Sequence, residues 1–522
     1  MATDVIIVGA GPVGLMLANQ LQRRGVRYRL LEGRSGREYW CKALGVSPRT
    51  LEIFDQMGLL GEALAHGLFF TASNTVVDGK RVARQEIPSD RYPYSPMAMG
   101  QFDTEEILER DLSRRGGRIE WSSQVNAFQR TMSGVEVEWT SPAGAQRELC
   151  RYLVGCDGAH SLVRKTLGLA FAGEKFDQHF FLGDVEIDWQ LSHTEIHKFI
   201  PLNQDGQLTN VVVVVPIPGN EKRYRLSLAL PAELVENPLE PMDMLRQVCL
   251  PVLPAGTSLD NLRWASHYSI SHRLTNKYRE GNCFLAGDAA HIHPPIGGLG
   301  MNTGLQDAYN LGWKLAAVLR GEALDSLLDS YHEERHKVGR EVVELTAGRM
   351  KDMTARKDRD EEAEERANTQ FFVNYRDCGL ALGSIPEGHA GAAPGERLDY
   401  LQGLRRPGLA ASLRLLEFLR HGDFQLIGYG GNWAEFAALA EHLRAAFGCQ
   451  IHCLAIAEPD GPQPPESVVC LHDAEGRVRR TWGGGPGAIL IRPDGYVGWR
   501  GRPARDAELD RFLAQVSIGL NP

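Results

Sequence analysis

A glycine-rich turn near the start of the chain has residue types and spacing suited to binding a dinucleotide. The segment Gly9-Ala10-Gly11-Pro12-Val13-Gly14 follows the apolar run Val5–Val8. Its glycines permit a tight turn, close approach of backbone to a pyrophosphate and close packing of the next helix, whose first amides favour phosphate. Glu32, at the end of the next predicted strand, can accept a hydrogen bond from a ribose hydroxyl. The turn predicts nucleotide binding but does not separate FAD from NAD.

Two later segments make FAD the predicted cofactor. The first is Asp157-Gly158-Ala159-His160-Ser161, followed by Arg164, and the second runs from Gly287-Asp288 to Pro294-Pro295-Ile296-Gly297-Gly298-Leu299-Gly300-Met301-Asn302. Asp288 ends a predicted buried strand, where its carboxylate can accept hydrogen bonds from a ribityl hydroxyl. The glycines leave room for a flat ring, and the following helix would direct its amides at the flavin edge that becomes negative on reduction. We expect one FAD, bound without a covalent link.

In this order, the three motifs resemble those of the FAD-dependent aromatic hydroxylases of the para-hydroxybenzoate hydroxylase type, which are single-component (class A) flavoprotein monooxygenases. The resemblance covers residues 1 to about 350. It implies hydroxylation of an aromatic, phenolic ring with O2 and NAD(P)H through a flavin hydroperoxide, with the cofactor carrying the difficult chemistry. NAD(P)H would bind transiently, since no second GxGxxG with strand and helix context is present. Related phenol hydroxylases carry an acid where Leu44 stands here, so no substrate-activating residue is identified.

The residue chemistry and the resemblance together give a set of predicted site residues. The loop on the reacting side of the flavin is expected to contain the catalytic positions Pro294, Gly297 and Gly298. Contacts with the cofactor are predicted for Gly9, Gly11, Pro12, Gly14, Glu32, Lys42, Gln101, Asp157, Arg164, Gly287, Asp288, Pro295, Gly300, Met301 and Asn302.

The substrate is predicted to lie under a sheet whose apolar residues include Phe180, Leu182, Phe199 and Val211–Val215. At least half of the valine run is expected to be plain strand core. No Arg or Lys stands out as an anchor for a substrate carboxylate, which favours a neutral or bulky phenol. Two alternatives stay open: Baeyer–Villiger oxygen insertion on the same scaffold, and a non-catalytic flavin-binding redox sensor.

The elements that must position these residues predict an α/β fold. A strand over 5–8, a helix over 12–24 and a strand over 28–31 form a βαβ unit, as in a Rossmann-like FAD-binding domain. Alternating segments between 176 and 272 indicate an inserted antiparallel-sheet domain for the substrate. The FAD-binding domain is therefore predicted to be discontinuous.

We expect the FAD-binding domain to comprise residues 1–175 and 273–385. After a linker rich in Gly, Ala and Pro, residues 390–522 resemble the thioredoxin-like C-terminal domain of the larger family members. This segment lacks a CxxC, so disulfide exchange is not expected of it. Its expected role is packing or support of a homodimer.

Composition narrows the possible partners and location. The 522 residues carry a net charge of −9 and no long basic stripe, which argues against nucleic acid as a partner. No apolar run is long enough to span a bilayer, and signal-peptide features are not recognised. Nine scattered cysteines are typical of reduced thiols in the cytoplasm. His291 and His293 have no third ligand at a recognisable spacing, so no metal is expected there.

Overall fold

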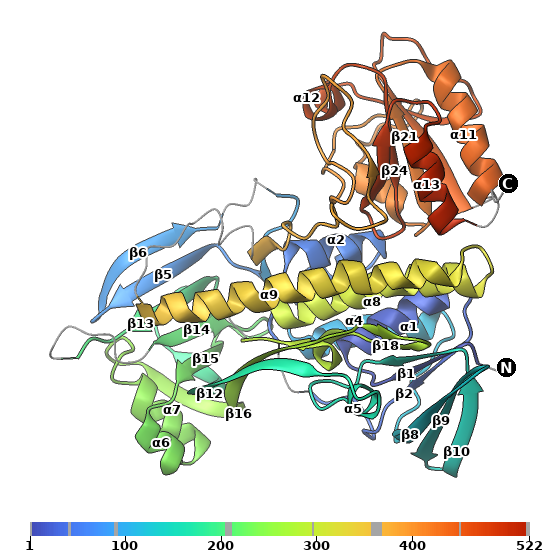
Figure 1. Ribbon diagram of the computed structural model, residues 1–522. Helices are drawn as coiled ribbons and strands as arrows, with labels where there is room; N and C mark the ends of the chain where they lie inside the picture. The colour runs from blue at the N-terminus through green and yellow to red at the C-terminus, as the bar shows by residue number, and fades with distance from the viewer. Residues whose placement is uncertain are drawn as a thin grey trace.

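The structure is a computed structural model, and it describes residues 3–39, 43–87, 92–203, 211–294, 297–355, 368–447 and 450–517. Figure 1 shows three parts: one built on the N-terminal strands (blue), a large sheet to its left (mostly green), and a C-terminal part above the first (orange and red). Two long helices, drawn in yellow, run between the C-terminal part and the two sheets below it.

The sheet of the N-terminal part contains β1 (Val5–Val8), β2 (Tyr28–Leu31), β11 (Tyr152–Gly155), β17 (Arg279–Glu280) and β18 (Cys283–Leu285). Their order is β17–β18–β11–β1–β2. β1 pairs in parallel with β2 and β11, and β11 pairs in parallel with β18. All four residues of β1 are buried, as expected for an apolar strand covered on both faces. The predicted βαβ unit is therefore present.

The long helices of this part are α1 (Pro12–Arg23), α4 (Gln101–Arg114), α8 (Leu299–Leu319) and α9 (Asp329–Ala355). α1 packs against both α4 and α8. A Cβ atom on Gly312 of α8 would lie 2.4 Å from the Gln20 Cβ of α1, so glycine is needed for the two helices to approach so closely. α1 ends at Arg23, one residue earlier than predicted, and Gly25 turns the chain with a φ of 68°.

Smaller elements complete the N-terminal part. One three-stranded sheet contains β8 (Gln124–Thr131), β9 (Gly134–Ser141) and β10 (Gly144–Cys150), and another contains β3 (Gly45–Val46), β4 (Leu68–Phe69) and β7 (Met97–Ala98). The shorter helices are α2 (Pro48–Gln56), α3 (Leu60–His66), α5 (Leu162–Thr166) and the 3-10 turns η1 (Gly287–Ala289) and η2 (Asp325–Leu328). Ser47 caps α2 by accepting a hydrogen bond from the Thr50 amide.

The second part is an eight-stranded, mostly antiparallel sheet in the order β19–β16–β12–β15–β14–β13–β5–β6. Its strands are β5 (Ala72–Val77), β6 (Lys80–Glu86), β12 (Phe171–Asp188), β13 (Glu195–Ile200), β14 (Val212–Pro216), β15 (Arg223–Ala229), β16 (Ser258–Thr275) and β19 (His291–Ile292). β5 and β6 come from well before residue 176 and join the sheet through a parallel pairing of β5 with β13. The sheet thus draws on more of the chain than the segment 176–272.

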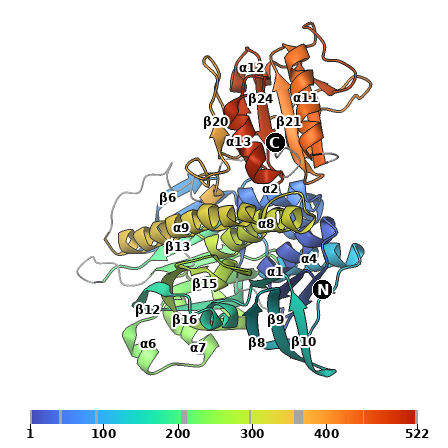
Figure 2. The same ribbon diagram turned by 45° about the vertical axis from the view of Figure 1, so that its right-hand side comes forward.

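The two faces of this sheet have different neighbours. α6 (Ala232–Glu236) and α7 (Pro241–Cys249) lie on its outer side in Figures 1 and 2, away from α8 and α9. Alternation along β12 turns Phe181 and Val185 into the core beneath these helices, and Phe180 and Leu182 to the opposite face. Phe199 packs in the same outer core, so its predicted place in the substrate roof is wrong.

The C-terminal part is a six-stranded sheet with helices α11 (Trp433–Phe447), α12 (Arg477–Trp482) and α13 (Ala507–Val516) and the 3-10 turn η3 (Leu415–Leu419). Its strands, in the order β20–β25–β24–β21–β22–β23, are β20 (Leu382–Gly383), β21 (Phe424–Tyr429), β22 (Ile451–Ala457), β23 (Val469–His472), β24 (Gly487–Ile491) and β25 (Val497–Gly501). Whether the domain is thioredoxin-like stays a prediction. In the described residues, no helix combines the length and apolar character needed to cross a membrane.

Buried ion pairs join the C-terminal part to α8 and α9. Arg492 binds Glu334 of α9 at 2.5 and 2.9 Å and also binds Asp494. Glu334 accepts from Lys314 of α8 at 2.7 Å, and all four side chains are almost completely buried. Asn310 of α8 donates to both Glu334 and Asp494. Because buried charges are tolerated only when paired, this network requires the two parts to stay docked.

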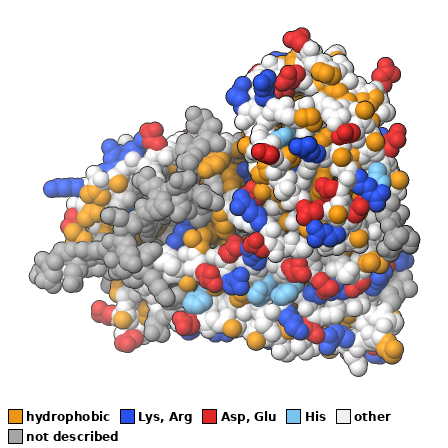
Figure 3. All heavy atoms as spheres, turned by 45° about the horizontal axis from the view of Figure 1, so that its top comes forward, with side chains coloured by type: hydrophobic (Ala, Val, Ile, Leu, Met, Phe, Trp, Pro, Cys, Tyr) orange, Lys and Arg blue, Asp and Glu red, His pale blue; other side chains and the backbone are white. Residues whose placement is uncertain are grey.

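A second group of ion pairs lies beside α2. Asp55 accepts from Arg414 at 2.9 Å and from Arg420 at 2.5 Å, and Arg397 donates to Glu52 at 2.8 Å. Across the top of the molecule, positive and negative side chains are interspersed on the C-terminal part (Figure 3).

We predict that Arg492→Met lowers the free energy of unfolding by about 3–5 kcal/mol, because Glu334 and Asp494 would stay buried with one cation fewer. Urea denaturation of the holoenzyme measures this. Arg505→Met is the control: its partner Asp510 and Arg505 itself are exposed, so the loss should be about 1 kcal/mol or less. Equal losses in the two variants would contradict the importance of the buried network.

Candidate active site

The predicted glycine turn has the shape needed to receive a pyrophosphate. Gly9 has a φ of 97°, and a Cβ atom there would lie 2.6 Å from the Cys156 carbonyl oxygen. A Cβ on Gly14 would lie 1.9 Å from the Gly9 oxygen, whereas no described atom lies within 4 Å of one on Gly11. Pro12 is the first residue of α1, and no described side chain caps that helix. The open side at Gly11 therefore faces free first-turn amides.

Glu32 braces the turn from the end of β2. Its Oε2 accepts from the Ala10 amide at 2.8 Å, and its Oε1 accepts from the amide and Nε of Arg34, each at 3.0 Å. Burial opposes ionisation, but the bonds from Arg34 and Ala10 hold the pKa of Glu32 below its ordinary value. The carboxylate is thus ionised and positioned beside the turn, as a ribose acceptor must be.

The Asp157 motif and Arg164 connect this turn to the second glycine segment. The Cβ position of Gly9 lies 3.2 Å from the Asp157 Cα, so the two turns pack directly together. Asp157 accepts from the Val163 amide at 3.2 Å. Arg164 donates to the Ala159 carbonyl at 2.8 Å and to the Ala289 carbonyl at 2.9 Å. Arg164 is buried, and these contacts make it a support for two loops.

The Gly287 turn lies against α1. Gly287 has a φ of 61°, and a Cβ on it would lie 2.8 Å from Cγ2 of Val13, the residue between Pro12 and Gly14. A Cβ on Gly304 of α8 would lie 2.7 Å from the same methyl. Segments almost three hundred residues apart are therefore in contact. Asp288 is exposed between buried neighbours, which suits a carboxylate that accepts from a ligand.

Asp307, in the middle of α8, fixes the Gly287 turn. Its Oδ2 accepts from the Gly287 amide at 3.0 Å and from His291 Nε2 at 2.8 Å, and its Oδ1 accepts from Arg335 at 2.7 Å. Arg335 also donates to the Thr303 carbonyl. Burial alone would raise the pKa of Asp307, but Arg335 and His291 hold it below its ordinary value. The turn thus rests on an ionised, fully buried carboxylate.

The loop before α8 is held through Asn302. Its Oδ1 accepts from the Ser47 amide at 2.9 Å and from Thr50 Oγ1 at 2.7 Å. Its Nδ2 donates to the carbonyls of Gly45 at 2.9 Å and Gly298 at 2.7 Å. Through the bonds to Gly45, Ser47 and Thr50, the Asn302 side chain fastens the loop to the start of α2 and the segment before it.

The remaining positions of this loop surround the start of α8. Gly297 and Gly298 have φ values of 84° and 65°, and Gly298 is the N-cap of the helix. A Cβ on Gly300 would lie 3.6 Å from His293 Nε2. Pro294 is buried, and Met301 is partly buried against the main core. The left-handed conformation at Gly297 and Gly298 is one that favours glycine.

Three further predictions concern the edges of the site. Gln101, the first residue of α4, accepts from the Ala43 amide at 3.3 Å and donates to Glu105 at 2.8 Å. It therefore borders the segment that follows Lys42. Lys42 and Pro295 lie outside the described residues, and their roles stay predictions.

These residues fit FAD. One open glycine turn with free helix amides, an ionised acid beside it and an exposed Asp288 match the phosphate, ribose and ribityl groups in turn. The second helix start, at Gly298, likewise has no side-chain cap among the described residues, so its first amides can face a ligand.

Comparison with known proteins identifies the family. An FAD binding domain family matches residues 2–346, and a family described as aromatic-ring hydroxylase, C-terminal, matches residues 392–517. The chain belongs to the FAD-dependent aromatic-ring hydroxylases. It is thus an FAD-dependent monooxygenase, and NAD(P)H serves as its transient electron donor.

Several relatives of this aromatic-ring hydroxylase match over nearly the whole chain. Pentachlorophenol 4-monooxygenase of Sphingobium chlorophenolicum is 31% identical, over 94% of this chain and 93% of the relative. The 6-methylpretetramide 4-monooxygenase of Streptomyces rimosus is 33% identical, over 99% and 94%. The solved structure of OxyS anhydrotetracycline hydroxylase from Streptomyces rimosus superimposes with a TM-score of 0.75, at 27% identity and 99% coverage of both chains. The predicted α/β class and the flavoprotein monooxygenase assignment are confirmed.

The sequence analysis did not identify the buried residues that hold the glycine turns of the candidate site in place. Asp307 and Arg335 lie in the interiors of α8 and α9 and form no motif with the glycines that they hold. The contact of Gly45 and Ser47 with Asn302 was also missed. The pair Ser47-Pro48 did carry a signal, because Ser followed by Pro is typical of a helix start.

We predict that Asp307→Asn weakens FAD binding at least tenfold, which is about 1.4 kcal/mol. The amide that replaces one carboxylate oxygen would point N–H groups at Arg335 or at His291 and the Gly287 amide. Flavin fluorescence during titration of the apoprotein measures the change. Asp329→Asn is the control, since Asp329 is 67% exposed beside Arg279, and its FAD affinity should match that of the wild type.

The same variant should change the response to acid. Because the pKa of Asp307 is depressed in the folded protein, its stabilising effect is present above about pH 4 and is lost as pH falls below that value. Asp307→Asn should lack this component in unfolding measured across pH 3–6. Identical acid profiles would argue against an ionised Asp307.

Proposed function

We propose that this enzyme hydroxylates a fused-ring phenol that carries no free carboxylate. The observation that carries the proposal is the inner face of the large sheet, which lies opposite α6 and α7. By strand alternation this face presents Phe180, Leu182, Val213, Val215, Trp264 and Tyr268. Such a broad apolar and aromatic surface suits a flat polycyclic substrate.

The charged groups of this face compensate one another. Arg225 donates to Asp184 at 2.8 and 2.9 Å in a bidentate pair, and both side chains are only 7% exposed. The Arg225 guanidinium also lies 5.1 Å from the ring centroid of Trp264. A cation already bound by a carboxylate is a poor anchor for another. This supports a neutral substrate.

The names of the relatives agree with this choice. Relatives named for polycyclic substrates include the 6-methylpretetramide, anhydrotetracycline and tetracenomycin A2 monooxygenases. Pentachlorophenol 4-monooxygenase is named for a phenol with a single ring, so a single-ring phenol is the alternative substrate class.

For the site residues, we propose the following division of work. The phosphates would bind at Gly9, Gly11, Pro12 and Gly14, with Glu32 at the ribose. Asp157, Gly287 and Asp288 would line the path to the flavin, with Lys42 and Gln101 beside it and Arg164 supporting the loops. Pro294, Pro295, Gly297, Gly298, Gly300 and Met301 would face the ring, with Asn302 holding them.

When bound, FAD supplies the activated oxygen after reduction by NAD(P)H. The chain's own contribution is to exclude water and to direct the amides at the start of α8 towards the pyrimidine edge of the flavin. Burial lowers the pKa of His293 to about 4, so this residue stays neutral at pH 7. Its Nδ1 lies 2.9 Å from the Pro294 carbonyl, which leaves Nε2 as an acceptor beside Gly300.

We also propose that residues 1–175 and 273–385 form the FAD-binding domain. Residues 176–272, together with β5 and β6, form the substrate domain. Residues 390–522 form a packing domain that supports a homodimer. The seven described cysteines are free, which supports the predicted cytoplasmic location.

The substrate proposal predicts that fused-ring phenols accelerate NAD(P)H oxidation by the holoenzyme at least tenfold over the unliganded rate. Mass analysis should show a gain of one oxygen on a ring carbon. Pentachlorophenol and simple phenols are the comparison set, and stimulation by these alone would overturn the fused-ring assignment. A lactone or ester product would instead indicate Baeyer–Villiger chemistry, and no stimulation by any bound aromatic would favour a sensor.

Tyr268 is the polar group of the inner face best placed to recognise a phenol oxygen. Among the described residues its buried hydroxyl has no hydrogen-bond partner, and burial raises its pKa to about 12, so it stays a donor at neutral pH. Tyr268→Phe should raise the KM for the phenol about tenfold, the value of one hydrogen bond, with FAD content unchanged. Tyr224→Phe, on the outer face, is the control. Equal KM values in the two variants would contradict a contact between Tyr268 and substrate.

A further inference from the structure

Three potential metal ligands meet in the C-terminal part, away from the residues assigned to FAD. Asp423 directly precedes β21, His421 lies two residues before it, and His452 is the second residue of β22. β21 and β22 are parallel neighbours, and Gln425 pairs with His452 in their register. The ends of two adjacent strands thus bring together residues almost thirty positions apart.

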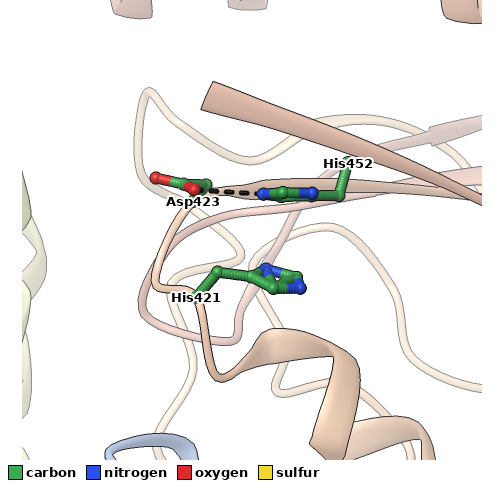
Figure 4. A group of neighbouring side chains, drawn as sticks. All are labelled: His421, Asp423 and His452. Carbon is green, nitrogen blue, oxygen red and sulfur yellow. Dashed lines mark hydrogen bonds and ion pairs between the residues drawn. The ribbon is translucent and has the colours of Figure 1, made fainter. Parts of the chain in front are cut away.

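The donor atoms are close enough for one ion to bridge them. One ligand atom from each residue lies within 4.8 Å of the other two. His452 Nε2 is already 3.1 Å from Asp423 Oδ2. Figure 4 shows the two imidazole rings one above the other beside the carboxylate, with centroids 3.8 Å apart and planes inclined by 30°. Ligands on a tetrahedral ion at about 2.1 Å stand about 3.4 Å apart, so small side-chain rotations suffice.

The site is open to solvent on one side. His421 is exposed, and the side chains of His452 and Asp423 are 41% and 32% exposed. An ion can therefore enter without unfolding of the sheet, and water can complete its coordination. Two imidazoles and one carboxylate form a nitrogen-rich set that suits Zn²⁺ and disfavours Ca²⁺ or Mg²⁺.

The surroundings connect this cluster to the FAD-binding part. Gly422, between His421 and Asp423, accepts a hydrogen bond from Arg24 at 3.0 Å. Arg24 follows the last residue of α1, and it is held in turn by Gln20. Arg24 interacts electrostatically with Asp423, and its positive charge weakens the attraction of that carboxylate for a cation. The opposite end of α1 begins at Pro12, about 18 Å away along the helix, so the ion would not take part in flavin chemistry.

We propose that His421, Asp423 and His452 bind one Zn²⁺ ion, which clips β21 to β22 and stiffens the contact between the C-terminal part and α1. The carboxylate supplies the negative charge, and each neutral imidazole supplies one nitrogen. The ion acts as a structural crosslink at the junction of the two parts.

The test uses the full-length, tag-free holoenzyme after removal of metal by a chelator. Equilibrium dialysis against Zn²⁺ should give one ion per chain with a micromolar Kd, and Zn²⁺ should raise the unfolding temperature. His421→Ala, Asp423→Asn and His452→Ala should each weaken binding at least tenfold and abolish the thermal shift. FAD absorbance and NAD(P)H oxidation should be unchanged in all three.

Two control variants show whether Zn²⁺ binds at the His421, Asp423 and His452 cluster or at other histidines. His442→Ala, on α11 of the same part, should bind Zn²⁺ as the wild type does. His267→Ala tests a second histidine pair, in which His267 Nε2 lies 2.9 Å from His179 Nδ1. The proposal is overturned if no stoichiometric binding occurs, if the three cluster variants bind like the wild type, or if His267→Ala alone abolishes binding.

Discussion

The carboxylate of Asp307 connects more of this structure than any single glycine of the cofactor motifs. It lies in the interior of α8 and accepts from the Gly287 amide, from His291 and from Arg335 of α9. Burying a charge is costly unless several donors surround it, so these three partners and the carboxylate must assemble together. The Gly287 turn then presses on Val13 of α1 and leaves Asp288 exposed. The position of the Gly287 turn in the candidate FAD site is therefore fixed by buried residues of α8 and α9 that lie beneath it.

The FAD-binding motifs could be read from sequence because their information is local. Gly9, Gly11 and Gly14 are required by backbone contacts at fixed short spacing, and strand β1 and helix α1 follow the apolar periodicity of their own residues. β2 begins at the residue expected from the sequence, and β14 begins one residue after the start of the valine run Val211–Val215. Asp288 was expected at the end of a buried strand; the strand, β18, ends at Leu285, and Asp288 lies in the 3-10 turn η1 that follows.

Contacts between residues that are distant in the sequence could not be predicted from local patterns. The sequence around Asp307 does not identify Arg335 as its ion-pair partner, because the two are brought together only by the packing of α8 on α9. Likewise, the sequence around Glu334 does not identify Arg492, because that pair forms only when the C-terminal part docks on α9. The face on which a strand residue lies was also underdetermined: Phe199 was expected over the substrate but packs beneath α6 and α7, since its register is set by pairing with β14. The joining of β5 and β6 to the large sheet had the same cause.

The strand order of the central sheet also constrains how the chain acquires its shape during synthesis. β1 is completed by β11, whose Tyr152 pairs with Val5, and α1 is covered by α8 at residues 299–319. At a translation rate of about 5–20 residues per second, the first apolar strand and helix wait tens of seconds for these partners. Such long-range pairing is slow to form and leaves apolar surface exposed meanwhile. Recombinant yield should therefore depend on chaperones and on growth temperature more than on the stability of the finished protein.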